Sequence, residues 1–386
     1  MKKVLFAMYY MNVGGVEKAL LGMLDMMPHD ACEVHVALIA PLGGFMQYIP
    51  DWVHVHTIEP FYRNISLIKH PMRTIVKDLA HGRMKAFADL WAFTKAKVTG
   101  DKRHVVRHLL RGHEALDGIE FDLAVSYASP HEYLDYFVGR YVKARKKAMW
   151  IHFDVSKAFN SRRSLLGAMN DVDRIFVVSE TGRQIFNKKY PELASKTVLF
   201  RNIISPTSIK RDAQQPSTFK RVNGALNIVT VGRLNREKGQ DLAISALLLL
   251  RQRGINAVLH LVGGGRTELQ CRNQALEAGI DDYVRFYGTQ VNPYPFMAGA
   301  DLYLQPSLHE GYCITLAEAK VFDAPIVATD FTGAREQLSA RSNAIVADDF
   351  TPEAIADAIV KAKDLAYIPG NDRDEKNDLD RLFEIL

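Results

Sequence analysis

Short apolar runs, rich in β-branched residues, alternate with helical stretches along nearly the whole chain, and this alternation limits the possible folds. Such a pattern predicts parallel β-sheets covered by helices on both faces, that is, an α/β fold. In the first half the strand-like runs are Val4–Tyr9, Val34–Ala40, Leu123–Tyr127, Ala148–His152, Ile175–Val178 and Val198–Phe200. In the second half they are Ile228–Val231, Val258–Val262, Val284–Tyr287, Leu302–Leu304, Ile326–Thr329 and Ala344–Val346.

The two halves are separated by a stretch that lacks a strong apolar period and is rich in Pro, Ser, Gln, Lys and Arg. We interpret residues 206–224 as a linker between two Rossmann-like domains, 1–205 and 225–366. The remaining residues, 367–386, are highly charged. We expect them to form a helix that packs back towards the N-terminal domain.

Composition places the chain among globular, cytoplasmic proteins. It has 386 residues, 48% hydrophobic and 24% charged, which is enough for two domains. Cys32, Cys271 and Cys313 are widely separated and form no CxxC motif, so neither a zinc cluster nor a disulfide framework is expected. The first apolar run, Val4–Met11, is too short for a signal peptide or a membrane span.

Several chemically suggestive residues directly follow predicted strands. In parallel sheets, ligands bind outside the carboxyl ends of the strands, so these loops are expected to meet at a ligand. The residues concerned are Gly14 and Gly15 after the first strand, Gly232 and Arg233 after Val231, Gly263 to Gly265 after Val262, and Glu310 soon after Leu304.

Two segments of the second half suit a nucleoside diphosphate sugar. Arg233 and Lys238 can neutralise its phosphates. Gly311 lets the backbone approach the ligand, and amides near Tyr312 to Thr315 would lie at the N-terminus of a helix predicted over Ile314–Phe322. Glu310 and Glu318 are then placed to accept hydrogen bonds from the ribose diol and the sugar.

These paired glutamates, the Gly-Arg…Lys run at 232–238 and the N-terminal Gly14-Gly15-Val16-Glu17 resemble the family 4, or group 1, retaining glycosyltransferases of the GT-B fold. The resemblance implies two Rossmann-like domains facing a cleft, with the acceptor in the N-terminal domain and the donor in the C-terminal one. It implies catalytic roles for His152, Glu310, Arg233 and Lys238. The implied donor site comprises Gly15, Gly232, Arg233, Lys238, Gly263, Glu310, Gly311, Tyr312, Cys313, Ile314 and Glu318.

The implied reaction moves a hexosyl unit, with retention, from an NDP-sugar to a glycan or lipid-linked acceptor in surface polysaccharide synthesis. UDP is the expected nucleotide, because it is the commonest in the family. The leaving phosphate is expected to take the acceptor proton, so no protein base is needed. No cofactor or metal is expected, and Asp171-Val172-Asp173, which tempts a metal interpretation, is better explained as a turn before a strand.

Each candidate also has a structural explanation. Gly14-Gly15 and Gly263-Gly264-Gly265 can be turns, while Arg233 and Lys238 can be solvated charges. His152 ends a strand, where a histidine often only packs, and Asp154 is placed to hold its ring. Where relatives often have Glu-Gly-Phe-Gly, this chain has Tyr312 and Cys313, which leaves the sugar open.

Residues 61–111 contain 12 Lys and Arg against 3 Asp, with aromatic residues interspersed. Such a segment can bind an anionic membrane surface, or it can be a solvated helical pair covering the acceptor site. Nucleic acid is not expected, since no recognised binding motif accompanies the charge. The chain is therefore expected in the cytoplasm, with a peripheral membrane location as the open alternative.

Two further functions remain as alternatives. An NDP-sugar epimerase on the same scaffold would need no acceptor and would mix sugar epimers in donor alone. A non-catalytic scaffold would bind a nucleotide sugar without transferring or hydrolysing it. A phosphorylase would need a lysine-bound pyridoxal cofactor, for which the sequence gives no support.

Overall fold

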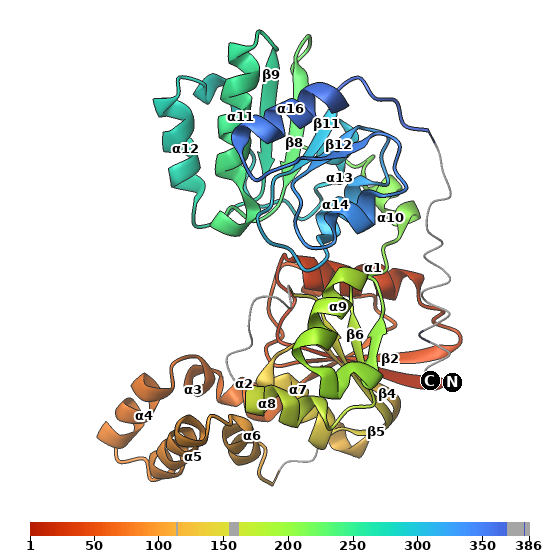
Figure 1. Cartoon of the computed structure of the whole chain (residues 1–386). Coiled ribbons are helices and arrows are strands. Elements are labelled where there is room, and N and C mark those ends of the chain that lie inside the picture. Colours follow the sequence, from red (N-terminus) through yellow and green to blue (C-terminus); the bar gives the residue numbers. More distant parts are fainter. Residues whose placement is uncertain (113–114, 154–161, 369–381, 383–386) are drawn as a thin grey trace. The chain divides into compact units, whose positions relative to one another are not determined.

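The structure of the chain is a computed structural model that describes residues 1–112, 115–153, 162–368 and 382 (Figure 1). The described residues form two compact units. Met1–Val178, Arg183–Arg201 and Leu382 belong to the first, while Ser179–Gly182 and residues 202–368 belong to the second. The change of unit at Arg201 lies close to the predicted start of the linker.

The first unit is built on a seven-stranded parallel sheet with the order β3-β2-β1-β4-β5-β6-β7. The strand order reverses between β1 and β4, which makes their carboxyl ends the switch point where ligands bind in such sheets. The strands are β1 (Lys2–Met8), β2 (Cys32–Leu38), β3 (His54–Thr57), β4 (Glu120–Ser129), β5 (Lys143–Ile151), β6 (Arg174–Val177) and β7 (Thr197–Leu199).

Helices connect these strands, and one group of them forms a lobe at the side of the sheet (Figure 1). The segment predicted as a helical pair contains more than two helices, because Asn64, Pro71, Gly82 and Gly100 interrupt it. The helices are α1 (Gly15–Met26), α2 (Glu59–Arg63), α3 (Ile65–Lys69), α4 (Pro71–Ala80), α5 (Lys85–Thr99), α6 (Arg103–Leu109), α7 (Glu132–Arg140), α8 (Arg162–Met169) and α9 (Glu180–Lys189).

The second unit contains a six-stranded parallel sheet with the order β10-β9-β8-β11-β12-β13 and a switch point between β8 and β11. Its strands are β8 (Leu226–Val231), β9 (Ala257–Val262), β10 (Val284–Phe286), β11 (Leu302–Gln305), β12 (Ile326–Ala328) and β13 (Ala344–Val346). Its helices are α10 (Pro206–Asp212), α11 (Gln240–Gln252), α12 (Glu268–Glu277), α13 (Tyr294–Ala298), α14 (Ile314–Ala319), α15 (Ala334–Leu338) and α16 (Pro352–Ala362).

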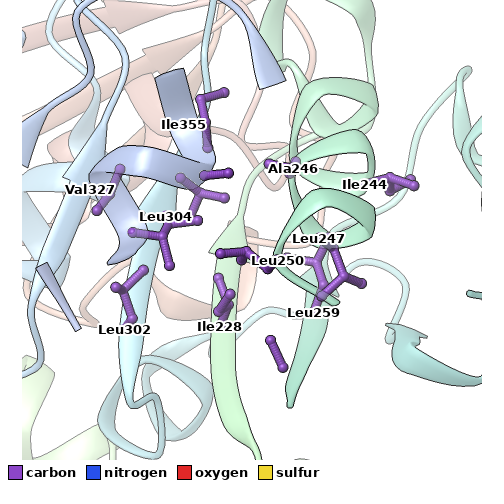
Figure 2. Close-up of a cluster of buried hydrophobic side chains, with 14 of the residues drawn as sticks. Ile228, Ile244, Ala246, Leu247, Leu250, Leu259, Leu302, Leu304, Val327 and Ile355 are labelled. Atoms are coloured by element: carbon purple, nitrogen blue, oxygen red, sulfur yellow. The ribbon is translucent and has the colours of Figure 1, made fainter. Parts of the chain in front are cut away.

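The core of the second unit lies between its sheet and the helices α11 and α16 (Figure 2). On α11 the buried side chains recur at Ala243, Leu247 and Leu250, a spacing that places them on one helix face. They pack over Ile228 of β8 and Leu259 of β9, which are neighbouring strands. This packing fixes α11, and therefore the loop that leads into it, against the carboxyl end of β8.

Every strand predicted from the sequence is present, so the predicted fold class of two Rossmann-like parallel sheets is confirmed. Strand β3 was missed because its two histidines at an edge of the sheet break the apolar pattern. Part of the predicted linker is the helix α10, which Ser205 caps by accepting a hydrogen bond from the Ser208 N–H. The predicted helix over 367–386 lies almost wholly outside the described residues.

None of the described helices combines the length and the apolar composition needed to cross a bilayer.

Replacing Leu250 by Ala tests the assignment of this core. Leu250 is fully buried, so Leu250→Ala should destabilise the second unit by about 2–5 kcal/mol, through lost burial and a residual cavity. Leu269→Ala on α12 is the matched control, because Leu269 is 71% exposed and its loss should cost no more than about 0.5 kcal/mol. Urea unfolding followed by circular dichroism measures both, and equal midpoints for the two variants would contradict the assignment.

Candidate functional site

The loops that follow β8 and β11 are joined by their backbones. After β8 the chain forms a 3₁₀ turn, Arg236–Lys238, whose cap Asn235 accepts a hydrogen bond from the Lys238 N–H at 3.2 Å. The Leu308 N–H donates to the Glu237 carbonyl at 2.8 Å. Gly239 has a φ of 65°, and a Cβ there would lie 2.0 Å from the Pro306 carbonyl oxygen, so only glycine fits.

The contact between these two loops places the Lys238 side chain beside the Glu310 carboxylate. The Lys238 Nζ lies 2.5 Å from the Glu310 Oε1, and the side chains are only 24% and 9% exposed. Burial alone would lower the pKa of Lys238, but the charge and hydrogen bond of Glu310 raise it above its usual value, so the ammonium stays protonated. The ammonium has three donors, and Glu310 uses one of them.

A chain of buried hydrogen bonds orients Glu310 from behind. The Ser307 hydroxyl donates to the same Oε1 at 2.8 Å, and the Gln305 Nε2 donates to the Ser307 oxygen at 2.8 Å. The Gln305 Oε1 in turn accepts from the hydroxyls of Tyr303 and Thr315 at 2.8 and 3.0 Å. Since every member is held by the next, the carboxylate is fixed before any ligand arrives.

Arg233 supplies a second positive charge. The residue is exposed, and its carbonyl oxygen accepts from the Gln240 Nε2 at 3.2 Å. It lies near enough to Lys238 to oppose that group's protonation. Within the described part of the chain no carboxylate forms an ion pair with Arg233. Two neighbouring cations, only one of which is paired with a carboxylate, form a site suited to an anion.

Glu318 lies one helical turn into α14 and is 3% exposed. The Tyr294 hydroxyl donates to its Oε1 at 2.7 Å. Burial raises the pKa of Tyr294, and the Glu318 carboxylate adds to this effect, so the phenol stays protonated and keeps donating. Tyr294 therefore fixes the orientation of Glu318.

The segment between the two glutamates makes a tight turn into α14. Cys313 precedes the helix with a φ of 62°, in the left-handed region where a residue other than glycine is uncommon. The Leu316 N–H donates to the Cys313 carbonyl at 3.1 Å, whereas the N–H groups of Ile314 and Thr315 precede the first helical bond and are available to a ligand. Helix α14 ends at Ala319, before the predicted Phe322, because the last residues change to shorter i→i−3 bonds such as Phe322 N–H to Ala319 O.

Burial raises the pKa of the Cys313 thiol, and the nearby Glu310 carboxylate raises it further. The thiol is therefore neutral and acts as a small buried side chain.

Two of the three glycines after β9 are required by packing against backbone. A Cβ at Gly263 would lie 2.0 Å from the Gly232 carbonyl oxygen, and one at Gly265 would lie 2.1 Å from the Leu234 carbonyl oxygen. The Leu234 N–H also donates to the Gly264 carbonyl at 3.0 Å. The glycine run thus lets the loop after β9 support the backbone that carries Arg233.

The first unit contains the other predicted residues. His152 follows β5, is 8% exposed and packs against the rings of Trp150 and Tyr127 at centroid distances of 5.6 and 4.6 Å. Asp154, predicted to hold its ring, lies outside the described residues. Gly15 begins α1, and the Glu17 carboxylate lies 2.5 Å from where a Cβ of Gly14 would be. An acidic group therefore already lies at this helix N-terminus, where Gly15 was expected to contact the donor.

The two aspartates of the Asp171-Val172-Asp173 motif have structural partners. The Asp171 carboxylate accepts from the Arg140 Nε at 2.5 Å, and the Asp173 carboxylate accepts from the Lys147 N–H at 2.8 Å. Both carboxylates stabilise the turn before β6, as the sequence interpretation has it.

The structure brings together Arg233, Lys238 and Glu310 in the second unit, with Glu318 on the adjoining α14. His152 and Gly15 belong to the first unit and remain candidate site residues there. Sequence reasoning missed Gln305, Ser307 and Tyr294. The first two were detectable in principle, since they directly follow a strand, but Tyr294 lies 24 residues from Glu318 in a different helix.

Replacing Gly263 by Ala tests the role of the glycine run. Gly263→Ala should destabilise the second unit and weaken nucleotide binding, since a Cβ has no room beside the Gly232 carbonyl. Gly254→Ala is the control, because Gly254 also has a positive φ but no atom lies within 4 Å of its Cβ position. It should cost only about 1–2 kcal/mol from backbone strain. Thermal unfolding measures the difference, and equal losses in the two variants would remove the packing role.

Comparisons with known proteins show what the segment that carries this site is similar to. Residues 213–374, which carry Arg233, Lys238, Glu310 and Glu318, match the family model "Glycosyl transferases group 1". A GDP-mannose-dependent alpha-(1-6)-phosphatidylinositol monomannoside mannosyltransferase from Mycobacterium tuberculosis is 28% identical over 217 residues, 52% of this chain and 55% of the relative. The chain thus aligns with about half the length of the curated relatives.

Two solved structures share the fold. The structure of Anabaena Alr3699/HepE in complex with UDP and glucose has a TM-score of 0.63 and 20% identity, covering 94% of this chain and 90% of that one. A point mutant of S. aureus TarM in complex with Fondaparinux, alpha-GlcNAc-glycerol and UDP has a TM-score of 0.69 and 12% identity, covering 100% and 99%. Residues 213–374 therefore carry the match to the group 1 glycosyltransferases, and the chain as a whole shares its fold with these two structures.

Proposed function

We propose that the protein is a retaining, metal-independent hexosyltransferase that moves a hexosyl unit from a UDP-sugar to a hydroxyl of a glycan or lipid-linked acceptor in surface polysaccharide synthesis. The observation that carries the proposal is the partly buried Lys238–Glu310 pair with Arg233 beside it. It combines cations for a diphosphate with a preorganised carboxylate for a sugar hydroxyl, in the segment that matches the family model.

The cations act on the leaving group. As the bond between the anomeric carbon and the phosphate oxygen breaks, negative charge grows on the diphosphate, and Arg233 and Lys238 stabilise it. The backbone N–H groups of the first turn of α14 add further donors. The acceptor oxygen forms the new bond to the anomeric carbon, and its proton passes to the leaving phosphate.

The carboxylates hold the neutral parts of the donor. Glu310, fixed by Ser307, accepts from hydroxyls of the transferred sugar, and Glu318, fixed by Tyr294, accepts from the ribose diol. A carboxylate can accept hydrogen bonds from both hydroxyls of a diol, whereas the cations of Arg233 and Lys238 can only donate. The carboxylates therefore bind the sugar and the ribose, and the cations bind the diphosphate. His152 is proposed to contact the sugar from the first unit, with Gly15 near the diphosphate.

The choice of UDP rests on the solved structures that share the fold, because HepE and TarM are both complexed with UDP. The mycobacterial relative is named for GDP-mannose, so GDP is the competing nucleotide. We propose no cofactor and no catalytic metal, since Arg233 and Lys238 already provide the positive charge. Complete loss of turnover in chelator, restored by magnesium or manganese, would contradict this.

A thermal-shift and hydrolysis panel of UDP, GDP, ADP and their hexose conjugates tests the donor site. UDP and one UDP-hexose should raise the unfolding temperature, with slow release of that sugar. Arg233→Ala should abolish the shift, because a charge-assisted bond to phosphate is worth about 1.5–3 kcal/mol. Arg236→Ala is the control, since Arg236 is also exposed in the same loop.

The panel also separates the alternatives. Epimer mixing in donor alone would establish an epimerase. Full donor binding with neither transfer nor hydrolysis across acceptors would establish a non-catalytic scaffold. A GDP-specific shift would correct the nucleotide, and no shift with any member would overturn the donor site.

We also propose that the first unit binds an anionic membrane through helices α4 and α5, which project at the side of the sheet (Figure 1). Met84, Phe87, Trp91 and Val98 are 59–81% exposed. Their spacing of three, four and seven residues places them on one face of α5. Met72 and Val76 form a second exposed pair, one turn apart, on α4. The apolar side chains of both helices are thus available to enter a lipid surface.

The exposed charges of residues 61–111 are all positive. Asp78, Asp89 and Asp101 are all buried and paired with Arg83, Lys85 or His108, and Arg103. The exposed surface of residues 61–111 therefore carries cations without acids. Lys95 lies 4.8 Å from the Trp91 ring centroid, at the centre of the apolar face. Among the described residues, Lys69, Arg73, Lys77 and Lys97 form no ion pair, and each can contribute about 1 kcal/mol at an anionic bilayer.

Liposome co-sedimentation tests this surface. The protein should sediment with phosphatidylglycerol vesicles at low salt, but not with phosphatidylcholine vesicles. The double variant Phe87→Ser and Trp91→Ser should remain in the supernatant. The double variant Leu269→Ser and Leu276→Ser is the matched control, because both leucines of α12 are similarly exposed. Equal sedimentation of the two double variants, or none of the wild type, would contradict the proposal.

A further inference from the structure

Two strands at the edge of the first sheet bring four ionisable side chains together, far in sequence from the donor residues. Glu33 and His35 lie two residues apart on β2, and His54 and His56 lie two residues apart on β3. The strands are parallel, and His35 is paired with His54. Residues two apart on a strand share a face, so all four side chains project from the same face of the sheet.

Three of these residues offer ligand atoms close to one another. The His35 Nε2 lies 2.9 Å from the Glu33 Oε1. One ligand atom each from Glu33, His35 and His54 lies within 4.8 Å of the other two. The His54 and His35 rings lie 4.8 Å apart, centroid to centroid. Because His54 is exposed and Glu33 half-buried, both can adjust while His35 stays fixed in the core.

The fourth residue holds the buried histidine. The His56 Nε2 lies 2.8 Å from the His35 Nδ1. When the His35 Nδ1–H donates to His56, the Nε2 lone pair points at the Glu33 carboxylate. Two acceptors then face each other, which is favourable only if a cation lies between them. In the other tautomer, the His56 Nε2–H donates to His35 and the His35 Nε2–H donates to Glu33.

The remaining surroundings permit a cation. The Lys3 Nζ lies 3.4 Å from the Glu33 Oε1, but this side chain is 42% exposed and can withdraw into solvent. The Phe121 ring covers His35 edge-on at 5.1 Å and shields it from water on that side.

We propose that Glu33, His35 and His54 bind one divalent metal ion of the zinc class, with His56 orienting His35. The ligands would be two imidazole nitrogens and one carboxylate oxygen. This set suits Zn²⁺, Ni²⁺ or Cu²⁺ and does not suit Mg²⁺ or Ca²⁺. Ligand atoms around a tetrahedral zinc lie about 3.3 Å apart, so small rotations of Glu33 and His54 close the site and leave a fourth position to water. The ion would link the short edge strand β3 to β2.

This site is independent of the proposed glycosyl transfer. Its residues belong to the first unit, while Arg233, Lys238, Glu310 and Glu318 belong to the second. The proposed metal ion would also have no part in catalysis, because the proposed transfer reaction needs no metal. Nucleotide-induced stabilisation should therefore be the same in variants that lose the metal.

Isothermal titration of untagged full-length protein, freed of metal by chelator and desalted, tests the site with Zn²⁺ alone. We expect one Zn²⁺ per chain and a higher unfolding temperature, with no response to Mg²⁺. His54→Gln and Glu33→Gln should each weaken binding at least tenfold. His56→Leu should weaken it about 10–100-fold, as the loss of a residue that orients a ligand does.

His108→Gln is the control. His108 lies 2.8 Å from the Asp89 carboxylate, so it reproduces a histidine–carboxylate pair, but the described residues give it no third ligand. Zinc binding should be unchanged in this variant. Absence of stoichiometric binding in the wild type would overturn the proposal. So would binding that persists undiminished in His54→Gln and Glu33→Gln, both of which change accessible side chains and should fold.

Discussion

The ion pair between Lys238 and Glu310 is the interaction on which the candidate site depends. Removing two charges from water is costly, and replacing a buried pair by apolar residues often stabilises a protein. This pair lies between two loops that are joined by backbone contacts, and a chain of hydrogen bonds through Ser307 and Gln305 orients it. Such an arrangement keeps a cation and a carboxylate partly desolvated, where both act strongly on a ligand.

The fold determines where this pair lies. The strand order of the second sheet reverses between β8 and β11, and the loops after these two strands carry Lys238 and Glu310. Glycines then bring the backbones together, because Gly239 contacts Pro306 and Gly263 contacts Gly232 at distances that no side chain permits. A sheet with a switch point therefore supplies the position, and local backbone chemistry supplies the close approach.

Much of this could be predicted from the sequence, for identifiable reasons. Buried parallel strands have a continuous apolar pattern, so their positions were predicted well, whereas β3 has histidines at an exposed edge and was missed. Arg233, Lys238 and Glu310 were found because they follow strands. Tyr294 was not, since its contact with Glu318 arises only from tertiary packing. The sequence also did not decide whether Gly263 forms a turn or contacts the nucleotide. The structure shows that the Gly232 carbonyl lies too close to Gly263 for any side chain.

The central claim is that Lys238 binds the diphosphate and Glu310 the sugar. Calorimetric titration of UDP and UDP-glucose against Lys238→Met and Glu310→Gln tests it most directly. We expect Lys238→Met to weaken both ligands by about 10–100-fold, the value of a charged hydrogen bond. We expect Glu310→Gln to weaken only UDP-glucose, leaving UDP unchanged or tighter because Lys238 loses its partner. Unchanged binding in Lys238→Met, or equal losses of UDP and UDP-glucose in Glu310→Gln, would contradict the account.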